Sequence, residues 1–141
     1  MKKVLCAAIA LLLAGALYSK AYADEAIKEG KWSVTVAVTT TGLPQAVSPQ
    51  TYTKESCVTN QNLVPDLKMP PGCSSPQVEK KDNTVSFNMS CDTQGMKMIS
   101  SGHVTYSGED MDGVSTSQMT VGGMEMNSTA QISGKYLGPC D

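Results

Sequence analysis

MTVGGMEM, residues 119–126, places a two-residue Gly-Gly loop between two alternating runs. A Gly-Gly pair flanked in this way predicts a tight β-hairpin, because both turn residues must adopt positive φ angles. The loop length also fixes the register, so Val121 should face Met124 and Met119 should face Met126. The same side of the sheet should continue through Ala130, Ile132 and Tyr136. The segment therefore predicts an antiparallel sheet.

Upstream of this hairpin the same period of two recurs. Apolar and small polar residues alternate from Trp32 to Thr39 and again over 85–91, and the β-branched content of the first run is typical of strands. One long strand is expected from Met96 to Ser107, because its apolar residues share a parity. Shorter strands are expected at 50–57 and 77–80.

One short helix is expected near residues 59–64, where Thr59 can cap one or two turns that stop before Pro65. No other helix is expected beyond the N-terminal segment. Seven to eight short strands joined by adjacent turns predict an all-β fold, an antiparallel meander curled into a half-barrel or a small sandwich.

Residues 1–23 have the order of a secretory signal peptide, with two lysines, an apolar run from Val4 to Leu17, and Ala21-Tyr22-Ala23 before Asp24. The apolar run is shorter than the roughly 20 residues that a membrane-spanning helix needs. A retained N-terminal anchor is the alternative. We therefore expect a single exported domain, 24–141, that is periplasmic or secreted and keeps no transmembrane segment after cleavage. The style of the signal is typical of bacteria.

The exported part is acidic. Loss of Lys2, Lys3 and Lys20 leaves eight of the 11 lysines against 13 acidic residues, a formal charge of −5, and the chain contains no arginine. Arginine is the residue that grips phosphate and carboxylate bidentately. Nucleic acid and anionic membrane surfaces are therefore not expected as partners.

Four cysteines remain after cleavage: Cys57, Cys73, Cys91 and Cys140. An even number in an exported chain indicates disulfides. Zinc is the competing interpretation, but it favours closely spaced pairs that this chain lacks. Three pairings are possible, of which we favour Cys57 with Cys73 and Cys91 with Cys140.

Methionine is abundant in the exported part, and two pairs are spaced two apart, Met96 with Met98 and Met124 with Met126. Neighbours two apart on a strand project to one side, and thioethers suit Cu(I). The competing interpretation is core packing, because methionine fills irregular gaps where aromatic residues are few. Val121 and Ile132 lie on the same side of the expected sheet as these methionines, and such apolar neighbours favour core packing over a metal site. We therefore expect Met119, Met124 and Met126 to be buried.

Other polar groups give weaker signals. His103 could act as a base or ligand, but an exposed strand histidine is the simpler interpretation. The acidic turn 109–113 lacks the remaining ligands of a calcium loop. Asn88 and Asn127 match the glycosylation pattern, yet both lie in expected strands, so the matches are attributed to chance unless the host is eukaryotic.

The chain shares a series of ordered motifs with a known family. They are Gly30-Lys31-Trp32-Ser33-Val34-Thr35, Cys57-Val58-Thr59, Pro71-Gly72-Cys73, Thr84-Val85-Ser86-Phe87, Gly102-His103-Val104-Thr105-Tyr106-Ser107-Gly108, Met111-Asp112-Gly113 and Gly134-Lys135-Tyr136-Leu137-Gly138-Pro139-Cys140. On these residues, over 30–140, it resembles the bacterial exported family called domain of unknown function 3617. Phe87 stands where tryptophan would be expected. The resemblance implies a periplasmic or exported β-rich domain with two disulfides, and it transfers no activity.

These observations favour a non-catalytic exported domain without catalytic, cofactor-binding or metal-binding residues. We expect it to bind a protein partner or a small apolar ligand, or to have a structural role in the envelope. A methionine-based Cu(I) binding protein is the alternative, and an unrecognised hydrolase ranks third.

Overall fold

The computed structural model of the protein describes residues 27–65, 72–93 and 95–141, so the predicted signal peptide, 1–23, lies outside the described residues. Within them the chain forms seven strands and no helix, and therefore no helix long and apolar enough to cross a membrane. The strands are β1 (Gly30–Thr41), β2 (Gln50–Val58), β3 (Gln77–Lys81), β4 (Thr84–Thr93), β5 (Met96–Ser107), β6 (Asp110–Val121) and β7 (Met124–Gly138).

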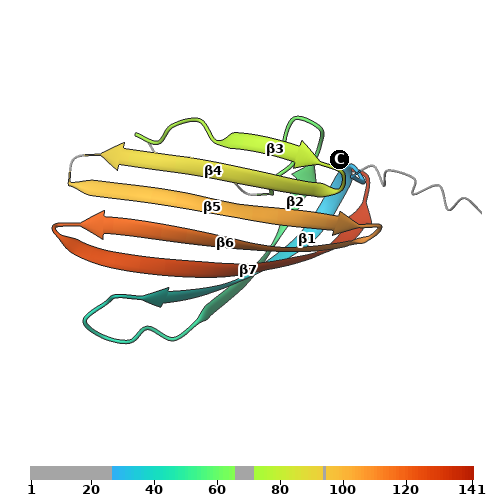
Figure 1. Cartoon of the computed structure of the whole chain (residues 1–141). Coiled ribbons are helices and arrows are strands. Elements are labelled where there is room, and N and C mark those ends of the chain that lie inside the picture. The colour runs from blue at the N-terminus through green and yellow to red at the C-terminus, as the bar shows by residue number, and fades with distance from the viewer. Residues whose placement is uncertain (1–26, 66–71, 94) are drawn as a thin grey trace, which may run out of the picture.

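All seven strands belong to one antiparallel sheet with the order β2-β1-β7-β6-β5-β4-β3. Strands β3 to β7 follow one another as a meander, whereas β1 pairs with the last strand of the chain. The sheet is open and curled (Figure 1). The all-β, antiparallel expectation is confirmed in its half-barrel form, and the single sheet rules out a two-sheet sandwich.

The predicted register of the last hairpin is confirmed. Val121 faces Met124 and Met119 faces Met126 across β6 and β7. Gly122 and Gly123 have φ angles of 57° and 82°, the left-handed conformation that a tight hairpin of this type requires. The long strand expected from Met96 to Ser107 is also present with those bounds.

The helix predicted near 59–64 is wrong. Thr59 and Asn62 instead form an isolated antiparallel bridge, with backbone hydrogen bonds of 3.2 and 2.9 Å in the two directions. The Thr59 hydroxyl accepts a hydrogen bond from the Asn62 N–H, as a cap would, but no turn of helix follows. Six residues are too few for a helix to be stable alone, and Pro65 disfavours helical geometry at Val64. Packing of Val64 into the core therefore decides the conformation.

The cysteines pair as Cys57 with Cys140 and Cys73 with Cys91, so the favoured pairing was wrong. Strand β1 lies between β2 and β7, and Lys31 on β1 faces Cys57 on one side and the end of β7 on the other. This arrangement brings the C-terminus beside β2. Cys73 forms an isolated bridge with Cys91, because the segment around it runs along the end of β4. All four cysteines of the described region are therefore bonded.

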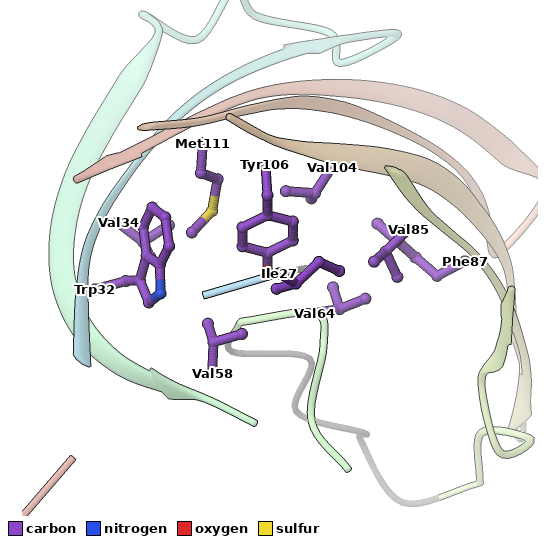
Figure 2. Close-up of a cluster of buried hydrophobic side chains, with 10 residues drawn as sticks. All are labelled: Ile27, Trp32, Val34, Val58, Val64, Val85, Phe87, Val104, Tyr106 and Met111. Carbon is purple, nitrogen blue, oxygen red and sulfur yellow. The ribbon is translucent and has the colours of Figure 1, made fainter. Parts of the chain in front are cut away.

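The hydrophobic core occupies one end of the concave face. Trp32, Tyr106 and Met111 rise from the sheet, with exposed fractions of 0%, 2% and 1%. Ile27, Val58 and Val64 close over them from the open side, as Figure 2 shows. Other members of the core are Val34, Val85, Phe87 and Val104.

The prediction that Met119, Met124 and Met126 are buried is wrong. Met119 and Met126 are half-buried, and Met124 is 52% exposed. Alternation predicted the correct face of the sheet. However, the described segments that cover the concave face, which carry Ile27, Val58 and Val64, lie at the opposite end of that face. The methionine buried at that end is Met111.

Candidate functional site on the concave face

The concave face is built from rows of side chains that run across the strands. Each row joins residues that are direct partners in the antiparallel register, because partners project to the same side. The row nearest the middle contains Phe87, Gly102, Ser115, Ala130 and Val38. The next row toward the core contains Val85, Val104, Gly113, Ile132, Val36 and Tyr52.

These two rows surround a cavity of about 160 Å³. Its wall is mainly aliphatic and aromatic, supplied by the sheet, and Val64 and Pro65 contribute from the segment that crosses the concave face. The full lining is Val34, Val36, Val38, Tyr52, Lys54, Ser56, Val64, Pro65, Phe87, Ser100, Val104, Ser115, Ala130 and Ile132. An apolar hollow beside the core is thus formed by residues from every strand except β3.

Small residues lie beneath the cavity, and two of them, Ser115 and Ala130, line it. Gly102, Ser115 and Ala130 are adjacent on β5, β6 and β7. A Cβ added at Gly102 would come within 2.6 Å of Phe87 Cζ and 2.7 Å of Ser115 Cβ. Glycine inside a strand weakens the strand and marks a place where other groups approach closely. Glycine at 102 therefore makes room for Phe87, which lines the cavity, and Ser115 and Ala130 leave the space beside it open.

A buried tyrosine holds residues 63–65 in place, the segment that forms the roof of the cavity. The Tyr106 hydroxyl donates a hydrogen bond of 2.6 Å to the carbonyl of Leu63, next to Val64 and Pro65. Burial raises the pKa of the Tyr106 hydroxyl above its ordinary value, because the charged phenolate would lose its hydration. The tyrosine therefore remains a neutral donor throughout the physiological pH range.

We expect this anchor to make stability fall at alkaline pH. Above about pH 10 the unfolded chain ionises the Tyr106 phenol while the folded chain keeps it protonated, so the free energy of unfolding falls by up to about 1.4 kcal/mol per pH unit from this group. Tyr106→Phe should lose that component and cost roughly 1 kcal/mol at neutral pH. Urea denaturation between pH 7 and pH 11 measures both effects. The control is Tyr52→Phe, at an exposed ring, and an equal change of slope in the two variants would contradict the assignment.

A band of hydroxyl groups borders the cavity on the side away from the core. Ser100, Ser117, Ser128 and Thr40 are partners across β5, β6, β7 and β1. Ser117 donates a hydrogen bond of 2.8 Å to Ser100, which is buried, and Ser128 and Thr40 are 3.1 Å apart. The band satisfies its own polar groups, since no buried side-chain nitrogen or oxygen of the described residues lacks a partner.

Beyond the hydroxyl band lie the methionines of the two hairpin tips. Met98, Met119 and Met126 are partners on β5, β6 and β7, and Met96 and Met124 belong to the outermost row with Val121. The concave face thus has three zones: a roofed core, an apolar cavity, and a partly open methionine cluster behind a polar band.

The other polar residues singled out from the sequence do not join this site. His103 is exposed on the convex face, near Ser86 and Thr116. Two acidic residues of the turn make ion pairs: Glu109 contacts Lys28 at 2.7 Å, and Asp110 contacts Lys135. In the described part of the chain no three His, Cys, Asp or Glu side chains are grouped to hold a metal ion. Asn88 and Asn127 are exposed positions on strands β4 and β7.

The residues that shape the cavity were not recognised from the sequence. Gly102, Ser115 and Ala130 have the inward parity, so three small side chains at matching depth were the available signal. Their alignment depends on the register of three strands, and only the β6–β7 register could be predicted from a turn. Val64 and Pro65 carried no signal, because a segment that crosses a sheet leaves no periodic pattern.

One curled antiparallel sheet, roofed over an apolar cavity and joined by two disulfides, defines an all-β half-barrel domain. A family model described as a protein of unknown function, DUF3617, matches residues 27–140. The chain belongs to this family, as its motifs indicated. No curated protein and no solved structure matches it significantly.

Proposed function

We propose that the protein is a non-catalytic, exported binding domain that holds a small apolar molecule in the concave-face cavity. The cavity itself is the observation that carries this proposal. An apolar cavity of about 150 Å³ in another protein stays dry and binds benzene or xenon, and the cavity found here is about 160 Å³. The ligand is therefore a molecule or a chain segment about the size of one aromatic ring.

The lining of the cavity supports binding rather than catalysis. It contains Ser56, Ser100 and Ser115, with Lys54 as its one charged residue, and no histidine, carboxylate or cysteine. A serine nucleophile needs a base within hydrogen-bond reach, and that base needs an orienting group. Ser100 instead accepts a hydrogen bond from Ser117, and His103 has the opposite parity on β5.

Export to the periplasm or beyond is supported by two independent features. The order of charged, apolar and small residues over 1–23 is that of a bacterial signal peptide. Disulfides persist in oxidising compartments and are rare in the cytosol, and this domain has two.

Filling the cavity should abolish binding without unfolding the protein. Ala130 lines the cavity, so Ala130→Leu places three further carbon atoms in the hollow. Benzene added to the wild-type protein should shift the methyl NMR signals of Val36, Val104 and Ile132, and these shifts should be absent in Ala130→Leu. Far-UV circular dichroism of the variant should stay that of the wild type.

The matched control is Gln131→Leu, the next residue of β7, which is exposed on the convex face. It adds the same side chain and should keep the benzene response. A wild-type protein that gives no response would contradict the ligand proposal and favour a protein partner or a structural envelope role. Equal loss in both variants would show that the response does not come from the cavity.

A further inference from the structure

Three methionines form a continuous row across the curled sheet. Met98 on β5 faces Met119 on β6, and Met119 faces Met126 on β7. In the sequence the visible pairs were Met96 with Met98 and Met124 with Met126, which are neighbours along single strands. The sheet instead aligns one methionine from each of three strands and places Met96 and Met124 in the adjoining row.

Core packing does not account for this row. All three methionines are half-buried, and Met124 beside them is 52% exposed. The main core cluster lies beyond the hydroxyl band, around and past the cavity. At the methionine end the buried neighbour is Cys91, the β4 partner of Met98, which is held in a disulfide with Cys73. The three methionine side chains therefore lie side by side and remain partly accessible to solvent.

The geometry allows the sulfur atoms to converge on one point. Partner residues on adjacent antiparallel strands have Cβ atoms about 4.5–5.5 Å apart. The row lies on the concave side of the curled sheet (Figure 1), where side chains from neighbouring strands approach one another. Methionine has an unbranched, flexible side chain, which lets Met98 and Met126 turn their sulfur atoms inward.

The chemistry of the donors selects the ion. Thioethers are soft and uncharged ligands that favour Cu(I), whereas Mg²⁺, Ca²⁺ and Mn²⁺ favour oxygen. The described residues hold no cluster of His, Cys, Asp or Glu that would attract zinc or another divalent ion. The formal charge of −5 on the exported part of the chain favours the approach of a cation.

We propose that Met98, Met119 and Met126 form a binding site for a single Cu(I) ion, with a fourth thioether available from Met96 or Met124. The site is separate from the apolar cavity, because the hydroxyl row of Ser100, Ser117 and Ser128 lies between them. It needs no deprotonation, since a thioether carries no proton to lose. Its affinity is therefore independent of pH between 5 and 8, unlike that of a histidine or thiolate site.

The test is an anaerobic titration of the disulfide-bonded protein with Cu(I) in competition with a chromogenic Cu(I) chelator. The wild-type protein should bind one equivalent, with the same affinity at pH 5 and pH 8. Met98→Leu, Met119→Leu and Met126→Leu keep an apolar side chain of similar volume and remove the sulfur ligand. Each should weaken binding at least about tenfold, as loss of groups around a metal commonly does.

The control is Met111→Leu, which removes a thioether from the buried core and should leave Cu(I) affinity unchanged. A second measurement follows the methionine ε-methyl NMR signals during titration with Ag(I), an air-stable soft ion. The signals of Met98, Met119 and Met126 should move together, and that of Met111 should stay in place.

Three results would overturn the proposal. Absence of competition with the chelator would mean that the row serves only as flexible apolar lining. Equal affinity in the wild type and in the variant with all three residues replaced by leucine would mean adventitious binding elsewhere. Loss of affinity at pH 5 would assign the ion to a proton-binding ligand. Benzene binding in the cavity is measured separately, so either proposal can fail without the other.

Discussion

Replacing Cys57 and Cys140 together with alanine should lower the free energy of unfolding by about 4.5 kcal/mol, and replacing Cys73 and Cys91 together should lower it by about 3 kcal/mol. A disulfide limits the conformations of the unfolded chain, and its contribution grows with the length of the loop that it closes. The two bridges span sequence separations of 83 and 18 residues. Urea denaturation of each double variant measures the difference.

The single variants Cys57→Ala and Cys140→Ala are the matched controls, and each should be about as unstable as the corresponding double variant. Peptide mapping of the unreduced wild-type protein should yield one linked pair with Cys57 and Cys140. A linked pair with Cys57 and Cys73 would contradict the strand order of the fold. A larger loss for the shorter loop would contradict the loop-length argument.

Trp32→Ala should cost about 3–5 kcal/mol, because it removes the largest fully buried side chain of the core. The indole ring meets Tyr106 and Tyr136 edge to face at centroid distances of 5.4 and 5.5 Å. Its Nε1–H also donates a hydrogen bond of 3.1 Å to the carbonyl of Lys28, which holds the segment before β1 over the core. Since whole domains are stable by only about 5–15 kcal/mol, this loss is a large fraction of the total, and the melting temperature should fall by many degrees.

Two further variants separate the contributions. Trp32→Phe keeps an aromatic ring but loses the hydrogen bond, so it should be less destabilising than Trp32→Ala. Leu137→Ala changes a large apolar residue that is 51% exposed on the same sheet, and it should alter the free energy of unfolding by less than about 0.5 kcal/mol. Far-UV circular dichroism during thermal denaturation is the measurement. A loss for Trp32→Ala no larger than that for Leu137→Ala would mean that the core is elsewhere.

Most of the sheet could be predicted from local patterns. Alternation over a few residues placed β1, β4 and β5, and the Gly122-Gly123 loop fixed the register of β6 and β7. These features depend on neighbours in sequence, because the parity of a strand and the geometry of a two-residue turn are both local properties.

The errors came from contacts that are distant in sequence. The disulfide pairing follows from the insertion of β1 between β2 and β7, which no turn encodes. Thr59 has the chemistry of a helix cap, but the burial of Val64 determines the conformation of its segment. Parity predicted the face on which Met126 lies, whereas the burial of its side chain depends on which end of that face is covered by other segments.

Neither the cavity nor the methionine row could be predicted from the sequence, and the reason is the same for both. Both are rows across strands, and their members are separated by hairpins and by whole strands in the sequence. Gly102, Ser115 and Ala130 are unremarkable individually. Ser115 and Ala130 come to line one cavity, and Gly102 makes room for Phe87 beside them, only when β5, β6 and β7 are aligned.

The pairing of β1 with β7 also determines when the sheet can be completed during synthesis or translocation. A chain that emerges N-terminus first presents β1 early, but Val36 on β1 can pair with Ile132 only after β7, the last strand, has emerged. Until then one edge of the β1–β2 hairpin has unpaired backbone groups, which is the kind of edge that recruits other chains. Pairing between such distant segments is intrinsically slow. The emerging chain is therefore vulnerable to aggregation until β7 has emerged. A partner that covers the unpaired edge of β1 would act before the domain has folded.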